Sequence, residues 1–208
     1  MTVDEIVRRI RARSERLASG LPVSEPPLGS DFSLNGVIPR PETYRAASVL
    51  VPLVNHADGL TVLLTQRTED MPSHAGQISF PGGRRQASDI DAVDTALRET
   101  QEEVGLERRF VTVIGILDRY RTGTSYEITP VVGLVEPGFT VRADPREVAD
   151  VFEVPLAHFL DEANHRIESR ILKDRERRYY AMPFGERYIW GATAGMLKNL
   201  QHALTAGD

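Results

Sequence analysis

The sequence predicts an α/β fold in which helices cover both faces of one mixed β-sheet. Apolar, β-branched segments occur before, between and after a single central helix, which is the order expected of a sheet covered by helices. Further helices are expected at both ends of the chain. With 208 residues and 41% hydrophobic content, the chain can build one sizeable core.

The first 45 residues are expected to form a helix and a connector ahead of the main domain, residues 46–208. Thr2 and Glu5 have the spacing of a capping box, and an apolar stripe follows them before Gly20: Val3, Ile6, Ile10 and Leu17. The acidic residues of this segment argue against a transit peptide, so the helix is expected to pack on the domain or on a second subunit. Residues 20–45 hold five of the thirteen prolines and predict an extended connector.

The remaining elements follow from the hydrophobic pattern. Strands are predicted at 46–54, 60–67, 77–80, 110–120, 128–135 and 148–154, with a short helix at 156–160. The segments 165–172 and 178–183 alternate enough to form a hairpin. A closing helix is expected over 188–204, because Thr193, Leu197, Leu200 and Leu204 share one helical face.

The central helix, predicted from Asp91 to Val104, carries an unusual concentration of negative charge. Glu99, Glu102 and Glu103 lie three and four residues apart, so they share one face and repel one another by roughly 0.2–0.5 kcal/mol per pair. Gly105 is the expected C-terminal cap, where the helix dipole also disfavours anions. Arg98 can offset only part of this charge. A divalent cation is the expected missing partner.

Composition excludes several classes of protein. Without cysteine the chain can form neither disulfides nor thiolate zinc sites, which fits a reducing cytoplasm. A net charge of −5 argues against nucleic-acid binding, and no apolar run is long enough for a membrane span. Only Lys173 and Lys198 among the 25 basic residues are lysines; genomic base composition explains this bias better than a specialised need to bind phosphate. A homodimer is possible, because the N-terminal helix and the connector have apolar residues to bury.

The segment around the acidic helix resembles the Nudix box, G-x5-E-x7-R-E-U-x-E-E-x-G-U, where U is a bulky aliphatic residue. Its second half matches as RETQEEVGL from Arg98 to Leu106, with Thr100 at the first U position. The first half is one residue longer than the family pattern, because Arg98 lies fifteen positions after Gly83. The expected glutamate is absent, and Asp89, Asp91 and Asp94 are the candidates to replace it.

The preceding stretch, Leu63–Gly83, resembles the coenzyme A pyrophosphatases within the Nudix superfamily. Their LLTxR, HxGQ and FPGG motifs match here as Leu64-Thr65-Gln66-Arg67, His74-Ala75-Gly76-Gln77 and Phe80-Pro81-Gly82-Gly83. An arginine common before the histidine is replaced by Pro72-Ser73. The resemblance extends through residues 129–133 and 190–194. It implies a Nudix-type α/β/α sandwich and hydrolysis of coenzyme A, or of its thioesters, to 3′,5′-ADP and (acyl-)phosphopantetheine.

The resemblance also implies roles for individual residues. Glu99 and Glu103, with Glu102 as a third carboxylate and a carbonyl of the Gly82-Gly83 turn, are the expected ligands of Mg²⁺ or Mn²⁺, while Arg98 orients the carboxylates. Such ions neutralise a diphosphate and lower the pKa of a bound water. The expected substrate contacts are Arg67, His74, Gln77 and Gly83.

Several alternatives stay open at this point. The general base is a glutamate of the box or a downstream acid such as Glu127. Arg119 and Arg121 are candidates for the 3′-phosphate of the substrate, and Trp190 is expected to be a core or interface anchor. Two other functions compete: hydrolysis of another nucleoside diphosphate derivative, such as ADP-ribose or a dinucleoside polyphosphate, and a non-catalytic nucleotide-binding module.

Overall fold

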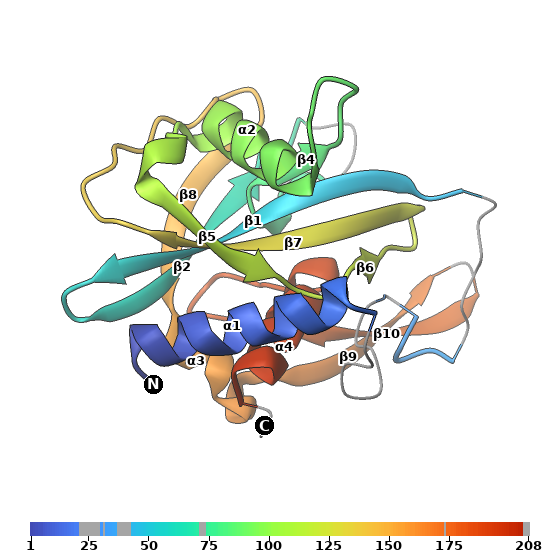
Figure 1. Ribbon diagram of the computed structural model, residues 1–208. Helices are drawn as coiled ribbons and strands as arrows, with labels where there is room; N and C mark the ends of the chain where they lie inside the picture. Colours follow the sequence, from blue (N-terminus) through green and yellow to red (C-terminus); the bar gives the residue numbers. More distant parts are fainter. Residues whose placement is uncertain (21–29, 31, 37–42, 71–73, 173, 206–208) are drawn as a thin grey trace.

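One mixed β-sheet organises the chain (Figure 1). The computed structural model describes residues 1–20, 30, 32–36, 43–70, 74–172 and 174–205. The central pair of the sheet is parallel, β1 (Arg45–His56) with β7 (Tyr126–Val135), and the other pairings in the sheet are antiparallel. The strand order is β3-β2-β1-β7-β5, with β4 paired to β1, β6 to β7 and β8 to β2. Their bounds are β2 Gly59–Arg67, β3 Ile78–Ser79, β4 Gly82–Arg84, β5 Val111–Ile116, β6 Tyr120–Arg121 and β8 Val148–Pro155.

Helices cover both faces of this sheet, as predicted. Helix α2 (Ala92–Val104) lies on one face, and α1 (Val3–Ala18), α3 (Leu156–Leu160) and α4 (Ala192–Thr205) lie on the other (Figure 1). Each face has its own apolar cluster, because side chains of β1 alternate between them: Leu50 packs with α2, whereas Val51 packs with α1 and α4. A separate hairpin, β9 (Arg166–Leu172) with β10 (Arg175–Ala181), lies beside α4. The α/β/α sandwich is therefore confirmed.

The second strand of the hairpin, predicted over 178–183, is β10 at Arg175–Ala181. Two further predicted boundaries were wrong, and both errors arise from long-range contacts. The strand predicted over 110–120 is interrupted: a 3₁₀ turn at Arg108–Phe110 precedes β5, and the ladder of β5 shifts register before Gly115. The final helix begins at Ala192 rather than Tyr188. Ile189 and Trp190 instead extend along β10, where the Met182 amide donates to the Ile189 carbonyl at 2.8 Å.

The N-terminal helix packs into the main core. Thr2 caps it, and Ile6 and Ile10 are buried in the same apolar cluster as the sheet. The Ser14 hydroxyl accepts a hydrogen bond from the Ile116 amide at 3.2 Å, and Arg13 pairs with Asp118. The apolar face of the helix is thus buried within its own chain and does not require a second subunit. Most of the predicted connector lies outside the described residues. No helix of the described part is long and apolar enough to cross a membrane.

Candidate active site

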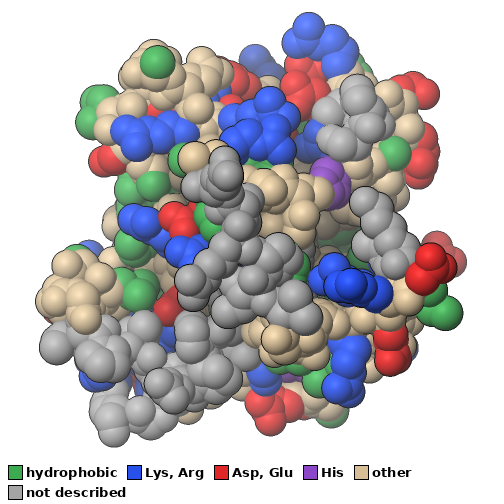
Figure 2. All heavy atoms as spheres, turned by 90° about the vertical axis from the view of Figure 1, so that its right-hand side faces the viewer, with side chains coloured by type: hydrophobic (Ala, Val, Ile, Leu, Met, Phe, Trp, Pro, Cys, Tyr) green, Lys and Arg blue, Asp and Glu red, His purple; other side chains and the backbone are tan. Residues whose placement is uncertain are grey.

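The predicted site residues meet along one large cavity. Its volume is about 840 Å³, and it runs from the β4–α2 junction, past β1 and β7, to the β9–β10 hairpin and the start of α4. On the face of the molecule in Figure 2, lysine and arginine side chains gather in several groups. The cavity wall includes seven of the predicted residues: Arg67, His74, Gln77, Gly82, Gly83, Glu99 and Glu103. Arg98 and Glu102, also on α2, are not part of the cavity wall.

Asp89 takes the position of the missing glutamate. Its two carboxylate oxygens accept hydrogen bonds from Nε and Nη2 of Arg98, at 2.8 and 3.0 Å. The Asp89 side chain is only 1% exposed, and it also accepts from the Gln86 amide and the Thr95 hydroxyl. The hydrogen bonds from Arg98 hold the pKa of Asp89 well below its usual range. The longer loop therefore still delivers a carboxylate to Arg98.

The other two aspartates of the loop have structural roles. Asp91 caps α2 by accepting from the Asp94 amide at 2.8 Å. Asp94 in turn pairs with Arg108 at 2.6 Å. Arg98 therefore pairs with Asp89, and not with Asp91 or Asp94, among the acidic residues of this loop.

Arg98 also reaches the acidic face of α2. Its Nη1 lies 2.9 Å from Oε1 of Glu99 and 2.9 Å from Oε2 of Glu102. Glu102 is 58% exposed and is not part of the cavity wall, whereas Glu99 lines the cavity. Burial raises the pKa of Glu99, and Arg98 opposes that shift. One guanidinium thus serves three carboxylates, which leaves the cluster short of positive charge.

Glu103 is the most deeply buried carboxyl group of the helix face. It is 7% exposed, accepts a hydrogen bond from the Gly82 amide at 2.9 Å, and lies 3.8 Å from Nη1 of Arg67. Burial raises the pKa of Glu103 to about 7, against the opposing effects of the Gly82 amide and Arg67. A buried carboxyl group with so few partners is suited to a site that receives a cation or a proton.

A fourth acid of the cavity wall, Glu147, was missed by the sequence analysis. It lies directly before β8, where Arg67 of β2 pairs in register with Val148. Its charge contributes to the raised pKa of both Glu99 and Glu103, which places it in the same electrostatic environment. No local motif marks this residue. Only the antiparallel pairing of β2 with β8 brings it to the site.

Glu127, the downstream acid named from the sequence, is engaged elsewhere. Its carboxylate pairs with Arg119 at 3.1 Å and with Arg121 at 2.9 Å. None of these three residues belongs to the cavity wall. The two arginines offered for the 3′-phosphate therefore share one carboxylate outside the cavity.

The loop before β3 supplies polar groups to the cavity. Nδ1 of His74 lies 2.8 Å from Oε1 of Gln77, and the Gln77 amide donates to the His74 carbonyl at 3.2 Å. Arg67 extends into the same region, and its buried Nε has no hydrogen-bond partner among the described residues. A buried donor without a partner is costly, so this nitrogen is poised for an acceptor that enters the cavity.

The glycines of β4 bring the backbone close to the acidic residues. A Cβ at Gly83 would lie 2.5 Å from Cδ of Glu99, so any side chain there would displace that carboxylate. A Cβ at Gly82 would lie 2.5 Å from the Cα of Val49 on β1. The FPGG turn is thus required for the close contact between strand and helix.

The donor set fits a divalent cation that shares its coordination with a substrate. No three acidic or histidine side chains of the described part already converge as a complete cation cage. Mg²⁺, however, is usually held by one or two carboxylates together with waters and substrate phosphates. Glu99 and Glu103 could supply hard oxygen ligands. The pKa of each is raised mainly by burial and further by neighbouring carboxylates, Glu147 among them.

At the far end, the cavity wall is aromatic and basic. Trp190 lines the cavity, its ring centroid 5.2 Å from that of Tyr179, and the Arg170 guanidinium lies 4.5 Å from the Trp190 ring. Trp190 was expected to be a core or interface anchor. It is instead a half-buried residue of the cavity.

The chain is similar to several known proteins. The NUDIX domain family matches residues 44–174. The chain is 39% identical to "Uncharacterized Nudix hydrolase NudL" of Escherichia coli K12 over 158 residues, which cover 76% of this chain and 81% of that protein. It is 37% identical to the protein of the same description from Photorhabdus laumondii, covering 76% and 84% of the two chains. The crystal structure of a MutT/nudix family protein from Enterococcus faecalis has a TM-score of 0.48 at 18% identity and covers 96% of this chain and 73% of that one.

The family match, residues 44–174, includes both the HAGQ–FPGG segment and the acidic helix. Nudix enzymes are pyrophosphohydrolases that act on nucleoside diphosphate derivatives and generally use divalent metal ions. The chain belongs to the Nudix hydrolase family.

Proposed function

We propose that this enzyme hydrolyses the diphosphate bond of coenzyme A or of its thioesters, giving 3′,5′-ADP and (acyl-)phosphopantetheine. The observation that carries the proposal is the continuous cavity of about 840 Å³, which joins the acidic cluster of α2 to a basic and aromatic wall. Coenzyme A has bulky groups on both sides of its diphosphate, so it needs room on both sides of the reacting bond. The LLTQR, HAGQ and FPGG segments support the same substrate class.

In this proposal, Glu99 and Glu103 hold a divalent cation, Mg²⁺ or Mn²⁺. Glu102 and a carbonyl of Gly82 remain predicted additional ligands. When bound, the cation neutralises phosphate oxygens and lowers the pKa of water. Arg98 keeps Glu99 and Glu102 oriented, and Asp89 fixes the guanidinium of Arg98 from the other side.

Arg67, His74, Gln77 and the backbone at Gly83 bind the diphosphate. The partnerless Nε of Arg67 supports this role, because a phosphate oxygen would satisfy it with a charge-assisted hydrogen bond. In the reaction, the oxygen of water bonds to one phosphorus, and the bond from that phosphorus to the bridging oxygen breaks. The bridging oxygen leaves with the other phosphate, and the proton of the water passes to a carboxylate.

We assign that proton acceptor to Glu147 rather than Glu127. Glu147 lines the cavity beside Glu99 and Glu103, whereas Glu127 is paired with two arginines outside it. Glu147→Gln should lower kcat by at least tenfold, as for loss of a general base, and leave KM nearly unchanged. Glu127→Gln is the matched control and should keep wild-type kinetics. Equal effects of the two substitutions on kcat would overturn the assignment.

A substrate panel tests the function itself. The protein is incubated with coenzyme A, acetyl-coenzyme A, ADP-ribose and a dinucleoside polyphosphate, with Mg²⁺ or Mn²⁺, and products are identified by mass. Cleavage of coenzyme A to 3′,5′-ADP at the highest kcat/KM supports the proposal. Turnover of ADP-ribose with coenzyme A left intact would refute it in favour of another nucleoside diphosphate derivative. No turnover of any compound would favour the non-catalytic module.

A further inference from the structure

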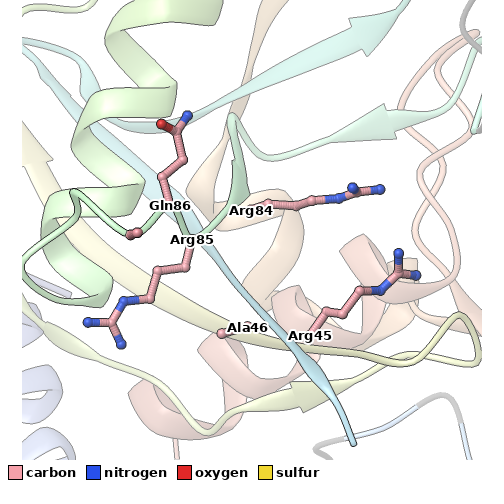
Figure 3. Close-up of a pocket in the computed structure, with 6 residues that line it drawn as sticks. Arg45, Ala46, Arg84, Arg85 and Gln86 are labelled. Atoms are coloured by element: carbon pink, nitrogen blue, oxygen red, sulfur yellow. The ribbon is translucent and has the colours of Figure 1, made fainter.

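Two arginines share one aromatic ring at the edge of the cavity. The guanidinium of Arg45 lies 4.1 Å from the ring centroid of Tyr126, and that of Arg84 lies 5.4 Å from the same centroid. In Figure 3, these two side chains extend in the same direction, whereas that of Arg85 points away. Arg85 donates to the carbonyl of Ile90 at 3.0 Å. Arg45 and Arg84 therefore form one cationic group, held in place by Tyr126.

This pair has no acidic partner in the part of the chain that the structure describes. Arg45 donates to the carbonyl of Thr124 at 3.1 Å, and Arg84 contacts the Tyr126 ring. By contrast, Arg119 and Arg121 both pair with Glu127. Two like charges near one ring repel each other unless an anion lies between them. The pair thus has unused hydrogen-bonding capacity for a ligand with more than one negative charge.

The position of Arg84 connects the pair to the reaction site. Arg84 directly follows Gly83, and its carbonyl accepts a hydrogen bond from Nη2 of Arg98 at 3.2 Å. Arg84 also lines both the large cavity and the smaller one of about 470 Å³ beside Arg45. An anion bound by the pair would therefore lie next to the diphosphate, at the open edge of the same cavity.

We propose that Arg45 and Arg84 form a subsite for a phosphate monoester adjacent to the scissile diphosphate, which in coenzyme A is the 3′-phosphate of the ribose. This inference rests on the proposed function. A phosphate monoester carries close to two negative charges and three acceptor oxygens, and two planar guanidinium groups match both properties. The subsite makes these residues determinants of specificity for substrates with a third phosphate. It replaces Arg119 and Arg121 in that role.

A binding experiment tests the subsite without catalysis. Titration calorimetry in EDTA compares adenosine 3′,5′-bisphosphate with AMP, for the wild type and for Arg84→Gln, Arg45→Gln and the double variant. The wild type should bind the bisphosphate at least tenfold more tightly, and each single substitution should remove most of that preference, as for loss of a charge-assisted hydrogen bond. Arg119→Gln, whose residue lies outside the cavity, should retain it. Thermal melts confirm that the variants are folded.

Steady-state kinetics provide a second test of the subsite. Arg84→Gln should lower kcat/KM for coenzyme A by about 10- to 100-fold and for dephospho-coenzyme A by less than about threefold, and Arg84→Lys should lie between these values for coenzyme A. An unchanged preference in the Arg84 and Arg45 variants overturns the subsite. So does loss of the preference in variants of Arg170 and Arg177, which face each other across the β9–β10 hairpin in the cavity. Failure to cleave coenzyme A while ADP-ribose is turned over overturns the proposed function alone.

Discussion

Among single residues, Glu103 is a buried carboxyl group whose ionisation destabilises the fold. Its folded-state pKa is raised from 4.5 to about 7, mainly by burial. Between these values the folded protein holds a proton that the unfolded chain has lost, so the free energy of unfolding falls as pH rises through this window. Above pH 7 the ionised group costs the fold about 3 kcal/mol in the absence of a cation.

Replacing Glu103 with glutamine should therefore stabilise the metal-free protein while abolishing most activity. Glutamine keeps an oxygen that can accept from the Gly82 amide but carries no charge to desolvate. In EDTA, urea unfolding of Glu103→Gln should give a larger free energy than wild type at pH 8, by up to about 3 kcal/mol, and a similar value near pH 4.5. Turnover should fall by orders of magnitude.

Glu102→Gln is the control for stability, since Glu102 is largely exposed and its pair with Arg98 contributes little. Glu102→Gln should change the free energy of unfolding at pH 8 only slightly. If Glu103→Gln were less stable than wild type at pH 8, or retained near-normal activity, the description of Glu103 as a costly, buried ligand would be wrong.

Asp89 allows a second test at this scale. Asp89→Asn removes the charge that fixes Arg98, so both the melting temperature and kcat should fall. Asp91→Asn is the matched comparison, because asparagine still caps a helix and Asp91 does not contact Arg98. Circular dichroism melts and initial rates measure the two effects. Equal activities in the two variants would show that the pairing of Arg98 with Asp89 does not matter for activity.

At the scale of elements, strand β4 and helix α2 form the site as a unit. β4 pairs with β1 through Val49 opposite Gly82 and Ser48 opposite Gly83. The Gly82 amide then reaches Glu103, and Gly83 lies against Glu99. The two adjacent glycines therefore face different neighbours: Gly82 the backbone of β1, and Gly83 the carboxylate of Glu99.

Alanine at these two positions should have different effects. Gly82→Ala should destabilise the protein strongly, because its Cβ would overlap the rigid backbone of β1 and its φ of +154° disfavours a side chain. Gly83→Ala should cost mainly activity, because it displaces the Glu99 carboxylate, which can rotate away. Urea unfolding and kcat/KM distinguish the two. A larger loss of stability at Gly83 than at Gly82 would contradict this account.

For the whole molecule, the features that depend on local sequence pattern were predicted correctly. Alternating and β-branched residues predicted β1, β2, β7 and β8 to within two residues, and the cap residues Asp91 and Gly105 bounded α2. The spacing of the carboxylates at positions 99, 102 and 103 predicted an acidic helix face in need of a cation, and the resemblance to the Nudix box supplied their expected roles. These features depend on neighbours along the chain.

Features set by contacts between distant segments could not be predicted. Glu147 joins the site only because β8 pairs with β2, and the Arg45–Arg84 pair forms only because β1 lies between β4 and β7. From the sequence, Glu127 remained a candidate general base, because its ion pairs with Arg119 and Arg121 form only across the β6–β7 turn. The predicted start of α4 was wrong for the same reason: Trp190 pairs with Ala181 of β10, so the helix begins only after it.

Binding of a divalent cation should stabilise the protein in a pH-dependent way. If the proposed cation site needs the fold and ionised carboxylates, a divalent cation should stabilise the protein by mass action, about 2.7 kcal/mol at a concentration of 100 Kd. Because the pKa of Glu103 is about 7, the rise in melting temperature caused by Mg²⁺ or Mn²⁺ should be small at pH 5.5 and larger at pH 8.

Differential scanning fluorimetry over a titration of Mn²⁺ measures this dependence without substrate. Glu103→Gln should show little rise at either pH, since the titrating carboxyl group is gone, and Arg119→Gln should behave as the wild type because its pair with Glu127 lies outside the cavity. A cation effect of equal size at both pH values would mean that the ion binds away from Glu103, on the exposed surface of the protein. The pH dependence therefore separates binding in the cavity from binding on the surface of α2, which activity measurements alone cannot do.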